Sequence, residues 1–365
     1  MAQVRLSADE IRAVRQVLKS GQLRAGLRTA EFEARFARAV GARFAVAVSS
    51  GTAALDLAYR ALLKPGDEVM VPDFTFVATA SMVVAVGAKL VFADVDPDTL
   101  TLDPTDVERR ITARTRALAP VHLYGQPADI ASLARLARRH RLKIIWDAAQ
   151  AHGARFRRQD VGSFPDLVCY SFYPTKNITT GEGGMVTTSN EGLAAELRLL
   201  RSHGEKGRYL HVRLGFNLRM TDIAAAIGLA QLAKLPAALE RRRRNAALLT
   251  KGLADIPGIK TPCICAGCEH AFSLYTAQLD PKTLRMTRDE FQKALAARGV
   301  ETAVHYPRPL HRQPIFHGHG SDRDFPVSTR LAETVVSLPV HPGLSLRDVR
   351  QIVRAVREVA GLTLS

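Results

Sequence analysis

Short apolar runs alternate with longer stretches rich in alanine and leucine along the first half of the chain. The runs are continuously apolar, and they predict strands at Phe44–Val48, Glu68–Val71, Lys89–Phe92, Ala117–His122, Lys143–Trp146, Leu167–Ser171 and Met185–Thr188. Apolar residues at helical spacing predict helices over about Ala8–Lys19, over Ala30–Val40 and between the strands. Because strands buried on both faces have such continuous sequences, the pattern predicts an α/β domain with a mainly parallel sheet.

The rhythm changes after a helix-rich passage from about Glu191 to Leu253. Beyond it we expect strands at Phe272–Leu279, Glu301–His305 and Val336–Val340, and helices at Arg288–Arg298, Val327–Val335 and Leu346–Val359. This order predicts a small α+β domain. We therefore expect a large domain over residues 1–250 and a small one over residues 251–365, packed tightly because no long linker separates them.

Composition and charge narrow the class of protein. The chain has 365 residues, of which 47% are hydrophobic and 24% charged, which excludes a disordered polymer, a fibre and a disulfide-rich miniprotein. The net charge of +16 favours anionic partners. Most arginines have helical spacing that is typical of solvated helix faces, including the run Arg241–Arg244. No groove-reading or stacking element accompanies them, so we expect no nucleic-acid partner.

The sequence also bears on the compartment. Four cysteines in 365 residues are not the pattern of an oxidising compartment. Met1–Asp9 lacks the apolar core of a signal peptide, and no apolar run approaches the roughly 18 residues that span a membrane. We expect a soluble cytoplasmic protein without membrane association.

Ligands of open parallel sheets bind at the carboxyl ends of the strands, so the residues after each strand are the first candidates for a site. The first strand ends in Ser49-Ser50-Gly51-Thr52 and enters a helix at about Ala53. Free N–H groups and the positive helix dipole suit a phosphate there. The alternative is that Ser50 or Thr52 simply caps the helix.

Two further strand ends carry charged residues. Asp147 ends the strand Lys143–Trp146, where a carboxylate requires a cation or strong donors; it is either a helix cap or the counter-ion of a protonated ring nitrogen. Lys176 follows the strand Leu167–Ser171 among aromatic residues and glycines. Partial desolvation there would lower the pKa of the amine and make it nucleophilic toward aldehydes.

Three strand ends of one sheet thus carry a phosphate cradle, a carboxylate and an amine. These are the parts that hold pyridoxal phosphate (PLP). The surrounding motifs are Ser50-Gly51-Thr52-Ala53-Ala54, Asp147-Ala148-Ala149-Gln150, Ser171-Phe172 with Lys176, Gly181-Glu182-Gly183-Gly184, Gly215-Phe216-Asn217-Leu218-Arg219-Met220 and His305-Tyr306-Pro307. In this order, over nearly the whole chain, they resemble the DegT-type sugar aminotransferases, PLP enzymes of fold type I.

This resemblance implies roles for individual residues. Lys176 would bind the cofactor covalently, Asp147 would pair with the pyridine nitrogen, and Gln150 would lie near the phenolic oxygen. The phosphate would be bound by Ser50, Gly51, Thr52 and Ser171. Phe76 would stack on the pyridine ring, although core packing is the alternative for this aromatic residue.

The resemblance further implies a homodimer with shared active sites, because Asn217 would reach the cofactor phosphate of the neighbouring subunit; taken alone, Asn217 would pass for a turn residue. Arg219, His305, Tyr306 and Arg308 resemble positions at the substrate entrance, where a guanidinium can bind a diphosphate bidentately. An ordinary surface role is the alternative for each of these four.

The chain departs from the family pattern at two places. Trp146 stands where many relatives have an acidic residue. Cys263, Cys265, Cys268 and His270 could form a zinc site, but the Cys-x-Cys start is tight, and we favour a reduced loop without metal. Cys169, inside a predicted strand, is expected in the core.

The implied activity is transfer of an amino group from glutamate or glutamine to a keto-sugar, with a nucleotide-linked sugar favoured, in amino-sugar and polysaccharide biosynthesis. PLP would be the cofactor and pyridoxamine phosphate the carrier of the amino group. Retention of Lys176 argues against the dehydratase branch, in which histidine replaces the lysine. The alternatives are a keto-cyclitol or other non-nucleotide ketone as acceptor, and a silent basic regulatory protein on the same scaffold.

Overall fold

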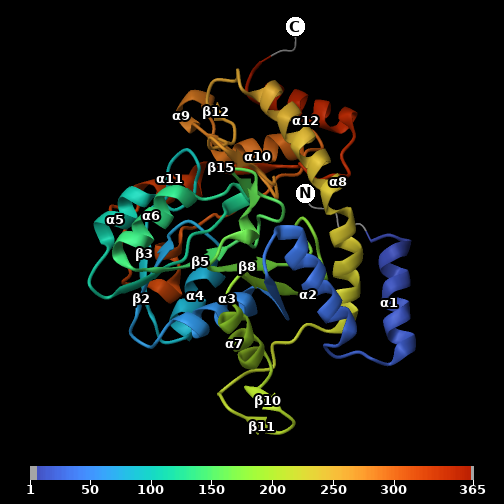
Figure 1. The fold of residues 1–365 in the computed structure, drawn as a ribbon. Coiled ribbons are helices and arrows are strands. Elements are labelled where there is room, and N and C mark those ends of the chain that lie inside the picture. The colour runs from blue at the N-terminus through green and yellow to red at the C-terminus, as the bar shows by residue number, and fades with distance from the viewer. Residues whose placement is uncertain (1–5, 363–365) are drawn as a thin grey trace.

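The computed structural model describes residues 6–362. A seven-stranded sheet lies at its centre (Figure 1). In spatial order the strands are β1 (Phe44–Val48), β9 (Gly184–Thr188), β8 (Leu167–Ser171), β5 (Lys143–Asp147), β4 (Thr115–Leu118), β2 (Glu68–Pro72) and β3 (Lys89–Ala93). The run from β8 to β3 pairs in parallel, and β9 is antiparallel to both of its neighbours. The mainly parallel sheet is confirmed.

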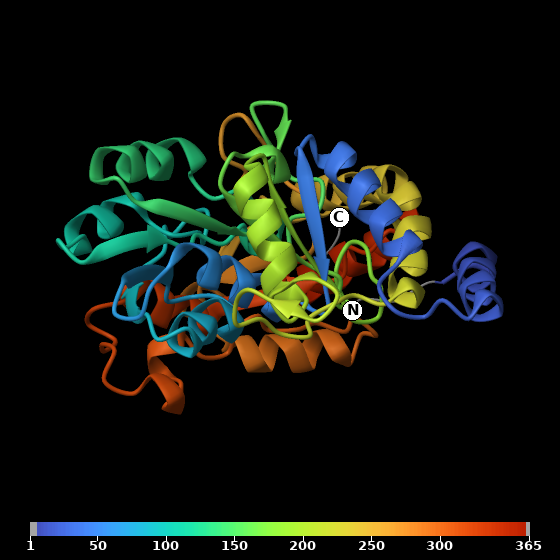
Figure 2. The same ribbon diagram turned by 60° about the horizontal axis from the view of Figure 1, so that its bottom comes forward.

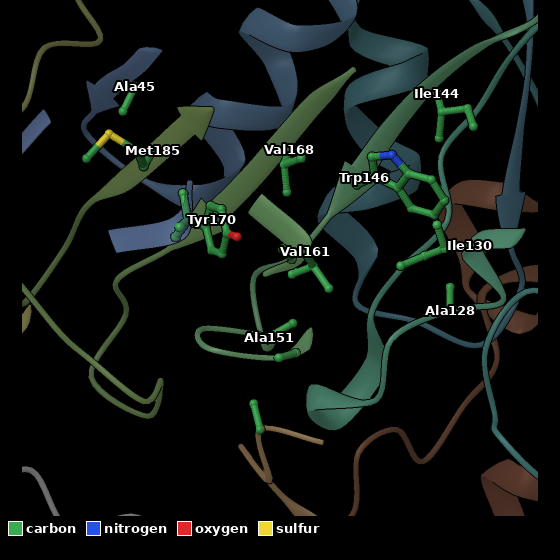
Figure 3. Packing of buried hydrophobic residues seen from close by; sticks show 14 of the residues in the cluster. Ala45, Ala128, Ile130, Ile144, Trp146, Ala151, Val161, Val168, Tyr170 and Met185 are labelled. Carbon is green, nitrogen blue, oxygen red and sulfur yellow. The ribbon is translucent and has the colours of Figure 1, made fainter. Parts of the chain in front are cut away.

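Helices cover both faces of this sheet. One face carries α3 (Gly51–Leu62), α4 (Val77–Ala85) and α7 (Glu191–Arg201), and the other carries α2 (Leu27–Val40), α5 (Pro104–Arg110) and α6 (Ile130–His140). Successive strand residues therefore alternate between two apolar clusters: Trp146 and Ile144 pack on the α6 side (Figure 3), and Ile145 packs on the α3 side. Burial on both faces explains why the strands lack polar alternation.

A second, smaller sheet lies above the first in Figure 1. Its antiparallel strands are β12 (Ile259–Lys260), β14 (Tyr275–Leu279) and β15 (Val335–Leu338). They share an apolar cluster with α10 (Arg288–Ala296), α12 (Leu346–Val359) and the last turns of α8 (Asp222–Leu253). The division at residue 250 falls inside α8, three residues before that helix ends, and stays a prediction.

The remaining elements are short, apart from the terminal helix α1. They are α1 (Ala8–Ser20), η1 (Leu123–Gly125), β6 (Arg155–Phe156), β7 (Gln159–Asp160), η2 (Val161–Ser163), β10 (Glu205–Gly207), β11 (Leu210–His211), β13 (Cys268–Glu269), α9 (Pro281–Leu284), η3 (Leu310–Arg312), η4 (Pro314–Phe316) and α11 (Pro326–Thr334). The hairpin β10–β11, which was not predicted, projects from the body beside α7 (Figure 1).

Three predicted strands differ from the structure. Ala117–His122 was expected to be one strand, but β4 ends at Leu118 because Pro120 has no N–H for the ladder. Glu301–His305 is not a strand, since within it only Ala303 pairs, in a bridge to Ser337. In the same small sheet, β14 begins at Tyr275, later than the expected Phe272.

The helix α8 bears on two further expectations. Among residues 6–362 it is the one helix that is long and apolar enough, by length and composition only, to cross a membrane. It packs against α1, α2 and α12 (Figure 2). Its arginine run is not simply solvated: Arg242 is buried and donates to the carbonyl oxygens of Phe272 and Ser273, and Arg243 donates to those of His270 and Gly153.

Candidate active site

The end of β1 and the start of α3 form a tightly packed cradle. Ser50 caps α3 by accepting a hydrogen bond from the Ala53 N–H at 3.1 Å. A Cβ on Gly51 would lie 2.6 Å from the Ser171 Cβ, and one on Gly184 would lie 2.2 Å from the Ser50 carbonyl oxygen. Glycine is therefore required at both positions, and the N-terminus of α3 lies directly beside the end of β8. The cap that was the alternative for Ser50 is present and leaves the remaining N–H groups of the first turn pointing outward.

Asp147 ends β5 and is buried at 4% exposure. One carboxylate oxygen accepts from the Thr79 hydroxyl at 2.8 Å, and the other accepts from the Ala149 N–H at 2.9 Å. Burial raises the pKa of this carboxyl, while the two hydrogen bonds and the charge of Lys176 oppose the rise. Each oxygen keeps a free lone pair, so the group can accept a further hydrogen bond from a ring N–H.

Lys176 lies on the loop between β8 and β9, half-buried, with its backbone N–H bonded to the Tyr173 carbonyl oxygen at 2.9 Å. Burial lowers the pKa of its amine, and the charge of Asp147 raises it again. The positive charge of Lys176 also acts on His152 and His305, lowering their pKa values after the larger effect of burial. The charge of Lys176 therefore influences groups at the end of β5 and in the segment around residue 305.

Gln150 links the large sheet to the segment His305–Arg308. Its side-chain oxygen accepts from the Tyr124 N–H at 2.7 Å, and its amide nitrogen donates to the Tyr306 hydroxyl at 2.9 Å. The Tyr124 hydroxyl in turn donates to the His305 carbonyl oxygen. Gln150, predicted near the cofactor, and Tyr306, predicted near the substrate, are thus in direct contact.

Phe76 is 54% exposed, which excludes the core role that was its alternative within the single chain. It lies immediately before α4, and its ring centroid is 6.1 Å from that of Tyr306. The exposed ring is free to stack on a planar ligand.

Two groups of predicted residues lie at the border of this region. The segment containing Asn217 and Arg219 runs along β1: the Ser49 N–H donates to the Leu218 carbonyl oxygen at 2.9 Å, and Arg219 bridges to Val48. Asn217 is exposed, as is Arg308 at the opposite border. We call Ser50, Gly51, Asp147, Ser171 and Lys176 the cofactor floor, and the segment His305–Arg308 the substrate wall.

Several residues of this region were missed in the sequence. Thr79 binds Asp147 from α4, although it has no motif of its own. His311 is buried between two carboxylates, with Nδ1 2.7 Å from Asp73 and Nε2 2.8 Å from Asp322. Asp73 begins the loop that carries Phe76, so His311 connects this loop to the chain just after the substrate wall. The only sequence signal for His311 was a single histidine five residues after Tyr306, and nothing in the sequence distinguishes it from a surface histidine.

The cysteine-rich loop stands apart from this arrangement. Among residues 6–362, no group of three or more histidine, cysteine or acidic side chains is placed to hold a metal ion. His270 is buried, and its Nδ1 accepts from the Phe272 N–H at 2.8 Å. Cys169 is in the core, as expected.

The residues present fit PLP. The N-terminal turn of α3 offers N–H groups to a phosphate. Asp147 has spare lone pairs for a protonated ring nitrogen, Lys176 supplies an amine, and Phe76 supplies an exposed aromatic face.

Comparison with known proteins agrees with this geometry. The chain matches the model of the DegT/DnrJ/EryC1/StrS aminotransferase family over residues 4–357. It is 41% identical over 358 residues to dTDP-3-amino-3,4,6-trideoxy-alpha-D-glucose transaminase of Streptomyces venezuelae, covering 97% of this chain and 93% of that protein. It is also 41% identical to UDP-N-acetyl-3-dehydro-alpha-D-glucosamine 3-aminotransferase of Acidithiobacillus ferrooxidans, covering 96% and 93%.

A solved structure, S. venezuelae DesV in complex with a ketimine intermediate, superposes with a TM-score of 0.94 at 41% identity, covering 98% of this chain and 95% of that chain. The predicted fold type I architecture, the aminotransferase activity and the PLP cofactor are thereby confirmed. The protein belongs to the DegT/DnrJ/EryC1/StrS aminotransferase family.

Proposed function

We propose that this protein transfers an amino group from glutamate or glutamine to the keto group of a nucleotide-linked sugar, in amino-sugar biosynthesis. The observation that carries the proposal is the buried Asp147 carboxylate, held by Thr79 and Ala149 at the end of β5, beside the strand β8 whose following loop carries Lys176. The two relatives described above are named for dTDP- and UDP-linked sugars. In the overall reaction the amino acid becomes a 2-oxo acid and the ketone becomes an amine, so no external oxidant is needed.

The cofactor floor supports the chemistry. When bound, PLP supplies an electron sink that accepts the negative charge left when a proton leaves the carbon bearing the amino group. Asp147 would pair with the ring nitrogen of the bound cofactor, and its negative charge would favour the protonated form of that nitrogen. Lys176 holds the cofactor and then accepts and returns a proton at Nζ; its lowered pKa makes the neutral amine more available. Ser50, Gly51, Thr52 and Ser171 hold the phosphate.

The substrate wall and Arg219 are assigned to the acceptor. Gln150 positions Tyr306 through a hydrogen bond. Burial, and then the charge of Lys176, lower the pKa of His305. Arg308 and Arg219 are suited to the diphosphate of a nucleotide sugar, because a guanidinium binds such groups bidentately. The net charge of +16 supports an anionic acceptor.

A homodimer is part of the proposal. Asn217 is exposed in the single chain, and the nearby β10–β11 region exposes Tyr209 at 79% and Leu214 at 84%. Apolar side chains gathered on a projecting hairpin are typical of a protein interface. Asn217 then contacts the phosphate bound by the partner. The free thiols of the four cysteines support a cytoplasmic location.

Mixing two inactive variants tests the shared site. Lys176→Ala and Asn217→Ala homodimers are each expected to be impaired. After subunit exchange, mixed dimers should regain activity at one of their two sites, because one site then contains both native residues. Recovery of activity in the mixture supports the proposal, and a monomer in analytical ultracentrifugation or no recovery in verified mixed dimers contradicts it.

Borohydride trapping tests the assignment of Lys176. Wild-type protein loaded with PLP and reduced should carry a covalent adduct on the peptide containing Lys176, and Lys176→Ala should carry none. Lys143→Ala is the matched control, because Lys143 is exposed at the opposite end of β5 from Asp147. An undiminished adduct in Lys176→Ala would show that another lysine binds the cofactor.

The acceptor is tested separately. The protein is converted to the pyridoxamine form with glutamate and then offered keto-sugars linked to dTDP, UDP or GDP, and keto-cyclitols. Return of the aldehyde absorbance with a nucleotide-linked sugar is the expected result. If the aldehyde absorbance returned only with a cyclitol, the protein would still be an aminotransferase, but its acceptor would not be a nucleotide-linked sugar.

A further inference from the structure

Cys265 and Cys268 flank a tight turn that leads into β13. The Cys268 N–H donates to the Cys265 carbonyl oxygen at 3.0 Å, and Gly267 between them has a φ of 76°. The Cα atoms at the two ends of such a turn lie within about 7 Å of each other. Disulfides join Cα atoms that are about 4.4–6.8 Å apart, so the backbone already has a spacing that a disulfide can span.

The two thiols also interact with each other. The neighbouring Cys265 thiol and the buried Gln126 amide lower the pKa of Cys268, and the neighbouring Cys268 thiol raises the pKa of Cys265. Cys268 is therefore the better nucleophile of the pair, since the thiolate is the reactive form.

Accessibility separates this pair from the other cysteines. Cys265 and Cys268 are half-buried, so a small oxidant can reach them, whereas Cys169 is 1% exposed inside β8. Cys263 is exposed, and burial of its sulfur together with nearby Cys265 raises its pKa. Only Cys268 combines partial exposure, a lowered pKa and an adjacent thiol.

The surrounding structure holds the turn in place. The Arg157 N–H donates to the Gly267 carbonyl oxygen at 2.8 Å, and Cys268 pairs with Phe156 in the β13–β6 ladder. The Ala271 N–H donates to the Gly125 carbonyl oxygen at 2.9 Å, next to Tyr124. A rigid turn lowers the entropic cost of bringing the sulfurs together.

We propose that Cys265 and Cys268 form a modification site that a peroxide converts reversibly into an intramolecular disulfide. The Cys268 thiolate attacks the peroxide, forming an S–O bond and breaking the O–O bond. The Cys265 sulfur then displaces the oxygen as water and forms the S–S bond. In total two thiols and hydrogen peroxide give one disulfide and two waters. A small dithiol reductant reverses the change by thiol–disulfide exchange.

Peptide mapping of the full-length protein tests this site. Cleavage after Lys260 and Lys282 places Cys263, Cys265 and Cys268 on one peptide. After hydrogen peroxide, unfolding and alkylation, this peptide should carry a single alkyl group, on Cys263, and should have lost two hydrogen masses. After dithiol treatment it should carry three alkyl groups. Cys169 should be alkylated in both samples.

Variants sharpen the result. In Cys263→Ser the oxidised peptide should carry no alkyl group, whereas Cys265→Ser should retain no 265–268 link and should accumulate sulfenic acid on Cys268. A link between Cys263 and either neighbour, or full alkylation of Cys265 and Cys268 after peroxide, would overturn the proposal. Zinc that remains on the purified wild-type protein but not on Cys268→Ser would also overturn it, because the thiols would then be metal ligands.

Discussion

The cofactor floor and the substrate wall are built on different principles. Most floor residues stand at or just after strand ends, where close backbone packing fixes them, and Lys176 lies on the loop that follows β8. Gly51 has no room for a Cβ beside Ser171. The wall is an irregular segment held by side chains, through the Tyr124 hydroxyl and the Gln150 amide. A region fixed by backbone tolerates few substitutions, whereas a region tied by side chains can change with its ligand. The proposed function therefore assigns the chemistry to the floor and the acceptor specificity to the wall.

The largest effect should come from breaking the floor. Asp147→Asn keeps the shape of the side chain but removes the charge opposite the ring nitrogen. We expect kcat to fall on the order of 100- to 10,000-fold, the range in which proton-transfer assistance contributes. The borohydride adduct on Lys176 should persist, because the amine is untouched. Steady-state kinetics and trapping on the same sample measure both effects.

Asp166→Asn is the matched control for this prediction. Asp166 precedes β8 in the same sheet, and burial raises the pKa of its carboxyl as it does for Asp147. Loss of a partly buried carboxylate alone should therefore leave kcat within about twofold of wild type. If both variants lost activity equally, the charge of Asp147 would have no special role.

An intermediate effect is expected where floor and wall are joined. His311→Asn retains an N–H that can reach Asp73 but loses the second ring nitrogen that contacts Asp322. The lost hydrogen bond ends on a solvent-exposed carboxylate, so the free energy of unfolding should fall by less than the loss of a fully buried hydrogen bond would cause. Urea unfolding measures this free energy. An unchanged midpoint would show that His311 does not stabilise the contact between the floor and the wall.

The pH dependence of the difference in unfolding free energy between wild type and His311→Asn is a stricter test of this role of His311. Burial lowers the pKa of His311, but the hydrogen bonds and charges of Asp73 and Asp322 outweigh it and hold the pKa above 6.5. Asp322 is also paired with Arg312. Because the folded pKa is raised, the stabilisation is complete below about pH 6.5 and is lost as pH rises through the folded value. The difference in unfolding free energy between wild type and His311→Asn should therefore decrease at alkaline pH. An increase would contradict the assignment.

The smallest effect should come from the exposed border of the wall. Arg308→Ala is expected to raise KM for the nucleotide sugar about two- to fivefold with kcat unchanged, as for exposed ion pairs. Added salt should shrink the difference, because screening weakens the wild-type contact. Arg308→Lys should recover only part of the affinity, since lysine lacks the bidentate fork. An unchanged KM in Arg308→Ala would place the diphosphate elsewhere.

The sequence by itself determined the order of the strands of the large sheet and, through the family motifs, predicted the floor. Parallel strands end at the same edge, so Ser50, Asp147 and Lys176 could be expected together before any coordinates. Local signals also predicted α1, α2 and α12, because amphipathic spacing is a property of short segments.

Only the tertiary structure decided how the floor meets the wall. Thr79 and Asp147 are 68 residues apart, and His311 and Asp73 are 238 residues apart, with no sequence pattern linking either pair. Arg242 likewise changed from an expected solvated residue to a buried donor. Periodicity reports which face of an element is buried, but the partner of a polar side chain depends on how distant loops dock.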